Sequence, residues 1–204
     1  MFFLRYESLK DYIRLYPVNA ALIAVQLAAF AATSVSGGLR DARVLLEFGG
    51  LSALPQYAGE YWRLVSSVFL HAGFSHLLLN GFVQYIFAPP MERILGKTKY
   101  LAFFILCGTA GGLASLSLER PALAVGSSAA IYGLFGAYLH LVLFRRIPLD
   151  EGSRKAVQVL IVIGLIYSVL VSRVSFWGHV GGAIAGFLLV SPLLSLRHSA
   201  PGRR

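Results

Sequence analysis

The chain has 204 residues, of which 57% are hydrophobic and only 13% are charged, with a formal net charge of +9. Soluble domains are about 45–50% apolar and about 25% charged, so this composition excludes an ordinary soluble enzyme and indicates a multi-pass membrane protein. The basic residues lie in small groups between long uncharged stretches, whereas nucleic-acid-binding proteins gather them on one face or tail, so we expect no nucleic-acid partner.

Six apolar segments follow one another along the chain. A helix that crosses a bilayer needs roughly 20 mostly apolar residues. The segments without Asp, Glu, Lys or Arg that approach this length are 18–36, 68–90, 100–118, 125–144, 156–172 and 176–196. The second segment holds Gly73, which indicates an irregular start, and the pair Pro89-Pro90, which indicates a firm stop. We therefore expect its regular helix to run from about Phe74 to Ala88. The sequence predicts one all-α, polytopic membrane domain of six helices over residues 1–204.

The first segment has a second interpretation. Arg5, Lys10 and Arg14 precede its apolar run, and residues 29–31 resemble the cleavage site of a signal peptide. The apolar run continues beyond that site, and the other helices need a partner for their small faces, so we favour a membrane helix.

The connections between the segments predict the orientation. Thirteen of the 18 Lys and Arg residues lie in the N-terminal segment, the second and fourth connections and the tail. Because basic residues concentrate on the cytoplasmic side, both termini are predicted to be cytoplasmic. The first connection, residues 37–63, is rich in Leu, Tyr and Trp, so we expect it to lie along the outer interface.

Polar side chains gather at the starts of the second, fourth and sixth segments, where lipid disfavours them. His76 and Asn80 are four residues apart and share one helix face. Ser128 and His179 each lie five residues after the start of an uncharged stretch, counted from Leu123 and Val174. At 1.5 Å per residue, His76, Ser128 and His179 lie about 5–10 Å inside the outer boundary of the membrane. Three inward-running helices therefore bring these groups to one level.

Acyl transfer is the chemistry that fits this set. A serine hydroxyl is a weak nucleophile until a base takes its proton, and His179 can serve as the base for Ser128. His76, Asn80 and the backbone N–H groups at the start of the fourth helix can stabilise the oxyanion. Because no Asp or Glu lies within the segments, the sequence predicts a Ser–His dyad rather than a triad. With no acidic or thiolate ligand beside the histidines, we expect no metal and no cofactor.

The same residues give the chain a resemblance to the rhomboid intramembrane serine proteases over nearly its whole length. The similar segments are Tyr61-Trp62-Arg63, His76-Leu-Leu-Leu-Asn80, Gly126-Ser127-Ser128 with Tyr132, and His179-Val-Gly-Gly182-Ala-Ile-Ala-Gly186. The resemblance implies a six-helix bundle of a multi-pass protein, which we expect in a bacterial plasma membrane. It implies that Ser128 is the nucleophile and His179 the base, with Tyr132 packed against the imidazole. His76, Asn80 and the Ser128 backbone N–H would form the oxyanion hole.

The chain departs from the family beside the nucleophile. Tyr132 lies one helical turn after Ser128, as in the family, whereas it lies about 100° off that face when counted from Ser127. We therefore choose Ser128, with Gly126 two residues before it. Family members usually have glycine where this chain has Ala129, and the added methyl group crowds the surface beside the nucleophile.

The expected activity is cleavage of a transmembrane segment of another protein in the bilayer, near the outer face. The rival hypothesis is a catalytically inactive relative that binds transmembrane clients, and the presence of both Ser128 and His179 favours the enzyme. A transporter would need a charged residue or a broken helix near the midplane in paired halves, and the sequence contains neither.

Overall fold

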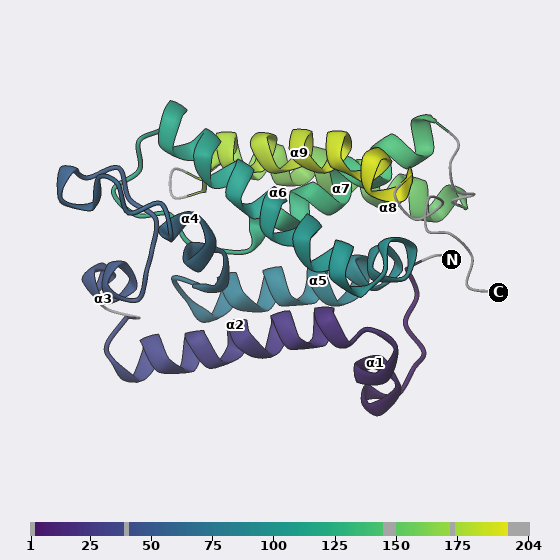
Figure 1. Cartoon of the computed structure of the whole chain (residues 1–204), viewed down its shortest axis with the longest axis horizontal. Coiled ribbons are helices and arrows are strands. Elements are labelled where there is room, and N and C mark those ends of the chain that lie inside the picture. Colours follow the sequence, from purple (N-terminus) through teal and green to yellow (C-terminus); the bar gives the residue numbers. More distant parts are fainter. Residues whose placement is uncertain (1–2, 39–40, 145–149, 172–173, 196–204) are drawn as a thin grey trace.

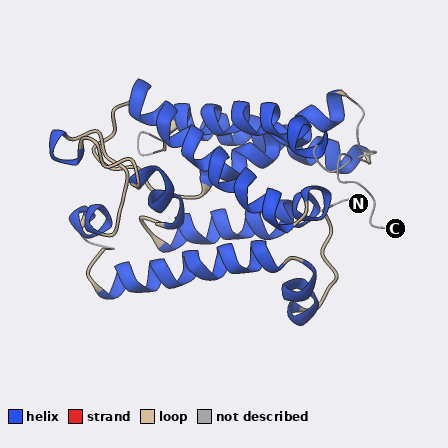
Figure 2. Ribbon diagram, viewed as in Figure 1, coloured by secondary structure: helices blue, strands red, loops and turns tan. Residues whose placement is uncertain are grey.

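The computed structural model describes residues 3–38, 41–144, 150–171 and 174–195. Their regular secondary structure is entirely helical (Figure 2), apart from one isolated β-bridge between Leu51 and Ala124. This confirms the predicted all-α class. The long helices are α2 (Pro17–Val35), α5 (Phe74–Leu95), α6 (Lys97–Leu118), α7 (Ser128–Leu143), α8 (Glu151–Leu170) and α9 (Phe176–Ser195). The short ones are α1 (Leu9–Leu15), α3 (Ala42–Glu47), η1 (Pro55–Tyr57), α4 (Arg63–Ser66) and η2 (Ser67–Phe69).

The long helices form one bundle and alternate in direction (Figure 1). Helices α2, α6 and α8 start at the end of the bundle where α1 lies. Helices α5, α7 and α9 start toward the opposite end, where α3 and α4 lie. The segments that carry the candidate site residues therefore run in the same direction, as the sequence predicts.

The helices confirm a polytopic membrane protein. Helices α2, α6, α8 and α9 are each long and apolar enough to cross a bilayer. Helix α5 meets this test together with residues 63–69, from which it is bent by 92°, and α7 is shorter, at 16 residues. The number of six crossings stays a prediction.

Helix α7 is the centre of the bundle. Its nine consecutive residues 130–138 are all buried, so this helix is covered on every side by protein. Helix α8 is the opposite case, because the only fully buried side chains among its 20 residues are Ser153, Val157 and Ser168. A helix that is apolar and exposed in this way faces lipid on most of its circumference.

Helix α5 corrects one expectation. The helix starts at Phe74, as expected, but it continues through Pro89 and Pro90 to Leu95, so the expected end at Ala88 is wrong. Pro89 has no N–H for the Tyr85 carbonyl, four residues earlier. The hydroxyl of Tyr12 in α1 donates to that carbonyl instead, at 3.2 Å. A contact distant in sequence thus satisfies the acceptor that the proline leaves open.

The predicted orientation can be checked directly. Reporter fusions at the N-terminus, near Lys97, near Gly152 and at the tail should report the cytoplasm, and fusions near Ala53 and Glu119 should report the outside. The reason is the distribution of basic residues. Seven of them lie outside the described residues: Arg40, Arg145, Arg146, Arg173, Arg197, Arg203 and Arg204. An external C-terminal reporter would contradict the prediction and place the starts of α5, α7 and α9 on the cytoplasmic side.

Candidate active site

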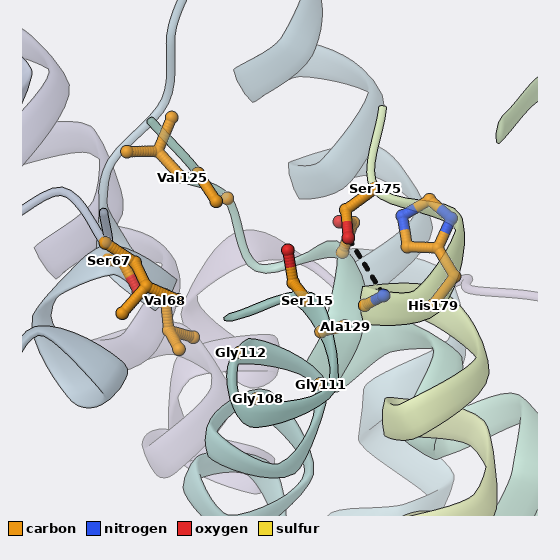
Figure 3. A pocket seen from close by; sticks show the side chains of 15 residues that line it. Ser67, Val68, Gly108, Gly111, Gly112, Ser115, Val125, Ala129, Ser175 and His179 are labelled. Atoms are coloured by element: carbon orange, nitrogen blue, oxygen red, sulfur yellow. Dashed lines mark hydrogen bonds between the residues drawn. The ribbon is translucent and has the colours of Figure 1, made fainter. Parts of the chain in front are cut away.

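A cavity of about 50 Å³ lies at the N-terminal ends of α7 and α9 (Figure 3). Its volume is enough to admit water, which needs only about 10–15 Å³ of such space. Its walls carry hydroxyl groups and an imidazole among small and apolar residues. The lining residues are Leu51, Ser67, Val68, Gly108, Gly111, Gly112, Ser115, Ala124, Val125, Gly126, Ser128, Ala129, Ser175, Gly178 and His179.

Ser128 is the first residue of α7, and the preceding loop is hydrogen-bonded to residues between α2 and α5. The Gly126 N–H donates to the Ser67 carbonyl at 2.9 Å, while Ala124 and Leu51 exchange backbone hydrogen bonds of 2.8 and 3.0 Å. The first N–H groups of a helix have no partner within it, and they carry the positive end of the helix dipole. The Ser128 N–H therefore lies at a helix end that favours negative charge, beside the cavity.

Gly126 sits where only glycine fits. Its φ is +125°, and a Cβ built on it would lie 2.7 Å from His76 Nε2 and 3.4 Å from Asn80 Nδ2. The side-chain nitrogens of His76 and Asn80 thus meet beside the backbone two residues before Ser128. Neither residue lines the cavity itself, and Asn80 Nδ2 has no hydrogen-bond partner among the described residues.

A second histidine packs against the ring of His76. The buried ring of His71 packs edge-on against the ring of His76, with centroids 5.1 Å apart and an interplanar angle of 70°. This contact limits the rotation of the His76 ring.

His179 lies in the first turn of α9. A hydrogen bond fixes the start of this helix, and an aromatic ring packs against the imidazole. Ser175 precedes this helix, and its Oγ accepts a hydrogen bond of 2.8 Å from the Gly178 N–H, shown as the dashed line in Figure 3. The imidazole is only 5% exposed and stacks on the Tyr132 ring, with centroids 4.1 Å apart and an interplanar angle of 9°. The stacking that the resemblance implied for Tyr132 is present.

Sequence reasoning missed Ser168. The Nδ1 atom of His179 lies 2.6 Å from Ser168 Oγ, which also donates to the Gly164 carbonyl at 2.7 Å. A serine in an apolar helix usually bonds to its own backbone, so nothing local distinguishes Ser168. Only the packing of α8 against α9 reveals its second partner.

Glu119, just beyond the end of α6, was also missed. Its carboxylate accepts hydrogen bonds from Ser115 Oγ at 2.9 Å, from Ser175 Oγ, and from the Trp177 N–H at 2.9 Å. It therefore ties the start of α9 to α6 and fixes the turn that carries His179. Two features of the sequence could have indicated this contact. Glu119 is an isolated acidic residue beside an apolar segment, and Ser175 is a serine at the expected start of a helix.

Small residues bring α7 and α9 together. A Cβ on Gly182 would collide with the Ala129 carbonyl, and one on Gly186 with the Gly133 carbonyl. Spacing small residues four apart allows helix backbones to approach closely in membranes. The same approach sets the separation between Ser128 and His179.

Ala129, where the sequence departs from the rhomboid pattern that it otherwise resembles, has room for its methyl group. Its Cβ lies 2.5 Å from where a Cβ would stand on Gly111 of α6. The glycine at position 111 leaves the space that the methyl occupies, so the methyl forms part of the cavity wall against α6.

The structure thus brings Ser128, His179 and Gly126 to one cavity, places Tyr132 against the imidazole, and points His76 and Asn80 at Gly126. Among the described contacts there is no hydrogen bond between Ser128 and His179. Catalytic hydrogen bonds are often long in the absence of substrate and tighten when it binds.

Comparisons with known proteins agree on one family. A family model described as the Rhomboid domain matches residues 58–196. YdcA of Bacillus subtilis (strain 168) is 34% identical over 192 residues, covering 92% of this chain and 94% of YdcA. The rhomboid protease GluP of the same organism is 31% identical over 182 residues, covering 89% of this chain but 36% of GluP. Rhomboid-like protease 3 of Toxoplasma gondii is 33% identical over 153 residues, covering 72% and 57% of the two chains.

Proposed function

The chain belongs to the rhomboid family, and we propose that it is an intramembrane serine endopeptidase of a bacterial plasma membrane. The observation that carries the proposal is the placement of Ser128 and His179 on two helices around one cavity, with the His179 ring held by Tyr132. The names of GluP and the Toxoplasma protein as proteases support the same class.

In the first half of the reaction, Ser128 Oγ attacks the carbonyl carbon of the scissile peptide while its proton passes to His179 Nε2. The carbonyl oxygen becomes an oxyanion, which accepts hydrogen bonds from the Ser128 N–H, His76 and Asn80. When the tetrahedral intermediate collapses, the C–N bond breaks and His179 returns the proton to the leaving amine. An ester to Ser128 remains.

In the second half, water enters the cavity and His179 takes one of its protons. The hydroxide equivalent attacks the ester carbonyl, the C–O bond to Ser128 breaks, and the proton returns to Ser128 Oγ. The products are a new amine and a new carboxylate. The hydroxyl groups of Ser67, Ser115 and Ser175 at the cavity wall suit this entry of water.

The proposed substrate is a transmembrane segment of another protein, cut near the outer face. Peptide exposed to lipid is normally helical, with its carbonyls bonded internally. The segment must therefore unwind locally before Ser128 can reach a carbonyl. We expect residues that weaken a helix near the cut and a small residue at the cut itself.

The test is incubation of the purified protein with a single-pass membrane substrate of the rhomboid type, followed by mass spectrometry of the fragments. Wild type should produce two fragments whose new ends lie within the outer part of the substrate's membrane segment. The matched comparison is Ala129→Gly, which should cut at an equal or higher rate because the cavity wall loses one methyl group. An inactive wild type would support the client-binding alternative, and rescue by Ala129→Gly would assign the inactivity to that methyl group.

A further inference from the structure

Ser168 is a buried polar residue on a helix that otherwise faces lipid. It is 4% exposed, and the other fully buried residues of α8, Ser153 and Val157, lie at the opposite end of the helix. A hydroxyl taken out of water needs hydrogen-bond partners. Ser168 interacts with the Tyr132 hydroxyl and with two further atoms. These are the Gly164 carbonyl at 2.7 Å and His179 Nδ1 at 2.6 Å.

The two contacts constrain where the protons lie. Ser168 has one hydroxyl proton, and Gly164 O can only accept. If the hydroxyl donates to Gly164 O, His179 Nδ1 must carry a proton and donate to Ser168 Oγ. If the hydroxyl instead donates to Nδ1, two oxygen lone pairs face each other across 2.7 Å and one hydrogen bond is lost. The first arrangement makes both bonds, so it is favoured.

We propose that Ser168 is a positioning residue that holds His179 in the tautomer with a protonated Nδ1 and a free Nε2. In that tautomer the lone pair of Nε2 is available to take the proton of Ser128, whereas in the other it is not. In a Ser-His-Asp triad, an aspartate holds the histidine in the correct tautomer. Here a neutral hydroxyl, aligned by a helix carbonyl, takes that place, and no carboxylate of the described residues is hydrogen-bonded to the ring.

The same hydrogen bonds also stabilise the protonated, positively charged form of His179. After His179 takes the proton, both ring nitrogens are donors, and the Nδ1–H bond to Ser168 Oγ becomes charge-assisted and stronger. Ser168 passes part of this polarisation to the Gly164 carbonyl. Helix α8 also meets the stacked pair of rings at Gly164, where a Cβ would collide with the Tyr132 hydroxyl. One face of α8, residues 164 and 168, thus supports both rings.

The inference rests on the proposed function for its catalytic meaning, but the tautomer can be measured without activity. In protein labelled with ¹⁵N-histidine, ring nitrogen shifts distinguish a protonated nitrogen from an unprotonated one. The chain has five histidines, and the signals of His179 are those lost in His179→Gln. In mildly alkaline buffer, wild type should show a protonated Nδ1 and an unprotonated Nε2.

Removing the hydroxyl should shift that equilibrium. In Ser168→Ala a buried Nδ1–H has no acceptor, so the proton should move toward Nε2. Ser168→Thr keeps the hydroxyl and should behave as wild type. Partners that orient metal-binding histidines cost about 10–100-fold when removed, and we expect a similar loss in kcat for Ser168→Ala with KM unchanged.

A matched control is Ser195→Ala, which removes a hydroxyl that donates to the Pro192 carbonyl at 2.8 Å, at the far end of α9. It should change neither the tautomer nor the rate. A protonated Nε2 in wild type, or an unchanged tautomer in Ser168→Ala, would overturn the inference. If Ser168→Ala does not fold, Ser168→Cys, with its weaker hydrogen-bonding group, takes its place. A wild type that cleaves nothing would refute the proposed function alone, because the ¹⁵N shifts still decide the role of Ser168.

Discussion

Replacing Ser128 by alanine should abolish both cleavage and labelling by a serine-directed fluorophosphonate, and His179→Ala should abolish cleavage as well. Without Oγ there is no nucleophile, and without the imidazole the hydroxyl keeps its proton at neutral pH. Where such residues act as a unit, losing either costs about 10⁶-fold in kcat. The Ser128→Ala/His179→Ala double variant should therefore be hardly slower than either single variant. Rates of substrate cleavage compare the two single variants with the double variant.

The neighbouring serine provides the control. Ser127→Ala removes a hydroxyl that is fully buried and has no hydrogen-bond partner among the described residues, whereas Ser128 lines the cavity. Ser127→Ala should label and cleave as wild type does. Labelling that survives in Ser128→Ala and disappears in Ser127→Ala would move the nucleophile by one residue. Losses that add in the double variant would count against a shared dyad.

Replacing the proposed oxyanion donors, His76 and Asn80, should have the next largest effect. We expect Asn80→Ala and His76→Ala each to lower kcat by about 10²–10³-fold, the usual cost of one lost donor in such a site. The reason is that Asn80 Nδ2 and His76 Nε2 meet beside Gly126, next to the N-terminal end of α7. KM should change little, because an oxyanion exists only after the attack. Steady-state kinetics on one substrate separate kcat from KM.

Ser75→Ala is the control for this pair, since Ser75 is exposed in the first turn of the same helix. Asn80→Asp tests the chemistry further, because it keeps the size of the side chain but replaces the donor with a negative charge. It should be no more active than Asn80→Ala. Wild-type kcat in both His76→Ala and Asn80→Ala would assign the pair a structural role.

The sequence alone determines the class of this protein, because hydropathy is a local property. A residue's transfer free energy into lipid does not depend on which helix becomes its neighbour. The apolar segments, the all-α fold and the residues that stand out in them, Ser128, His179, His76 and Asn80, are therefore readable along the chain. The family resemblance adds the stacking partner Tyr132, which the structure places against the imidazole.

Tertiary structure decides the features that depend on a partner distant in sequence. Pro89 and Pro90 predict a helix end, yet α5 continues to Leu95. Tyr12, 73 residues away in the chain, satisfies the Tyr85 carbonyl that Pro89 leaves open. The crowding of a methyl at Ala129 is likewise relieved by Gly111 on another helix.

The residues that surround the candidate base, His179, could not be predicted from the sequence for the same reason. Ser168 resembles any serine that bonds to its own helix, and Glu119 resembles any charge at a membrane surface. Which face of α8 turns toward His179, and which carboxylate meets the start of α9, depends on how the helices pack. Packing energies are sums over contacts between segments, and no single segment contains them. The proposed nucleophile and base are therefore visible in the sequence, whereas the hydroxyl and carboxylate that contact the proposed base and its helix are visible only in the fold.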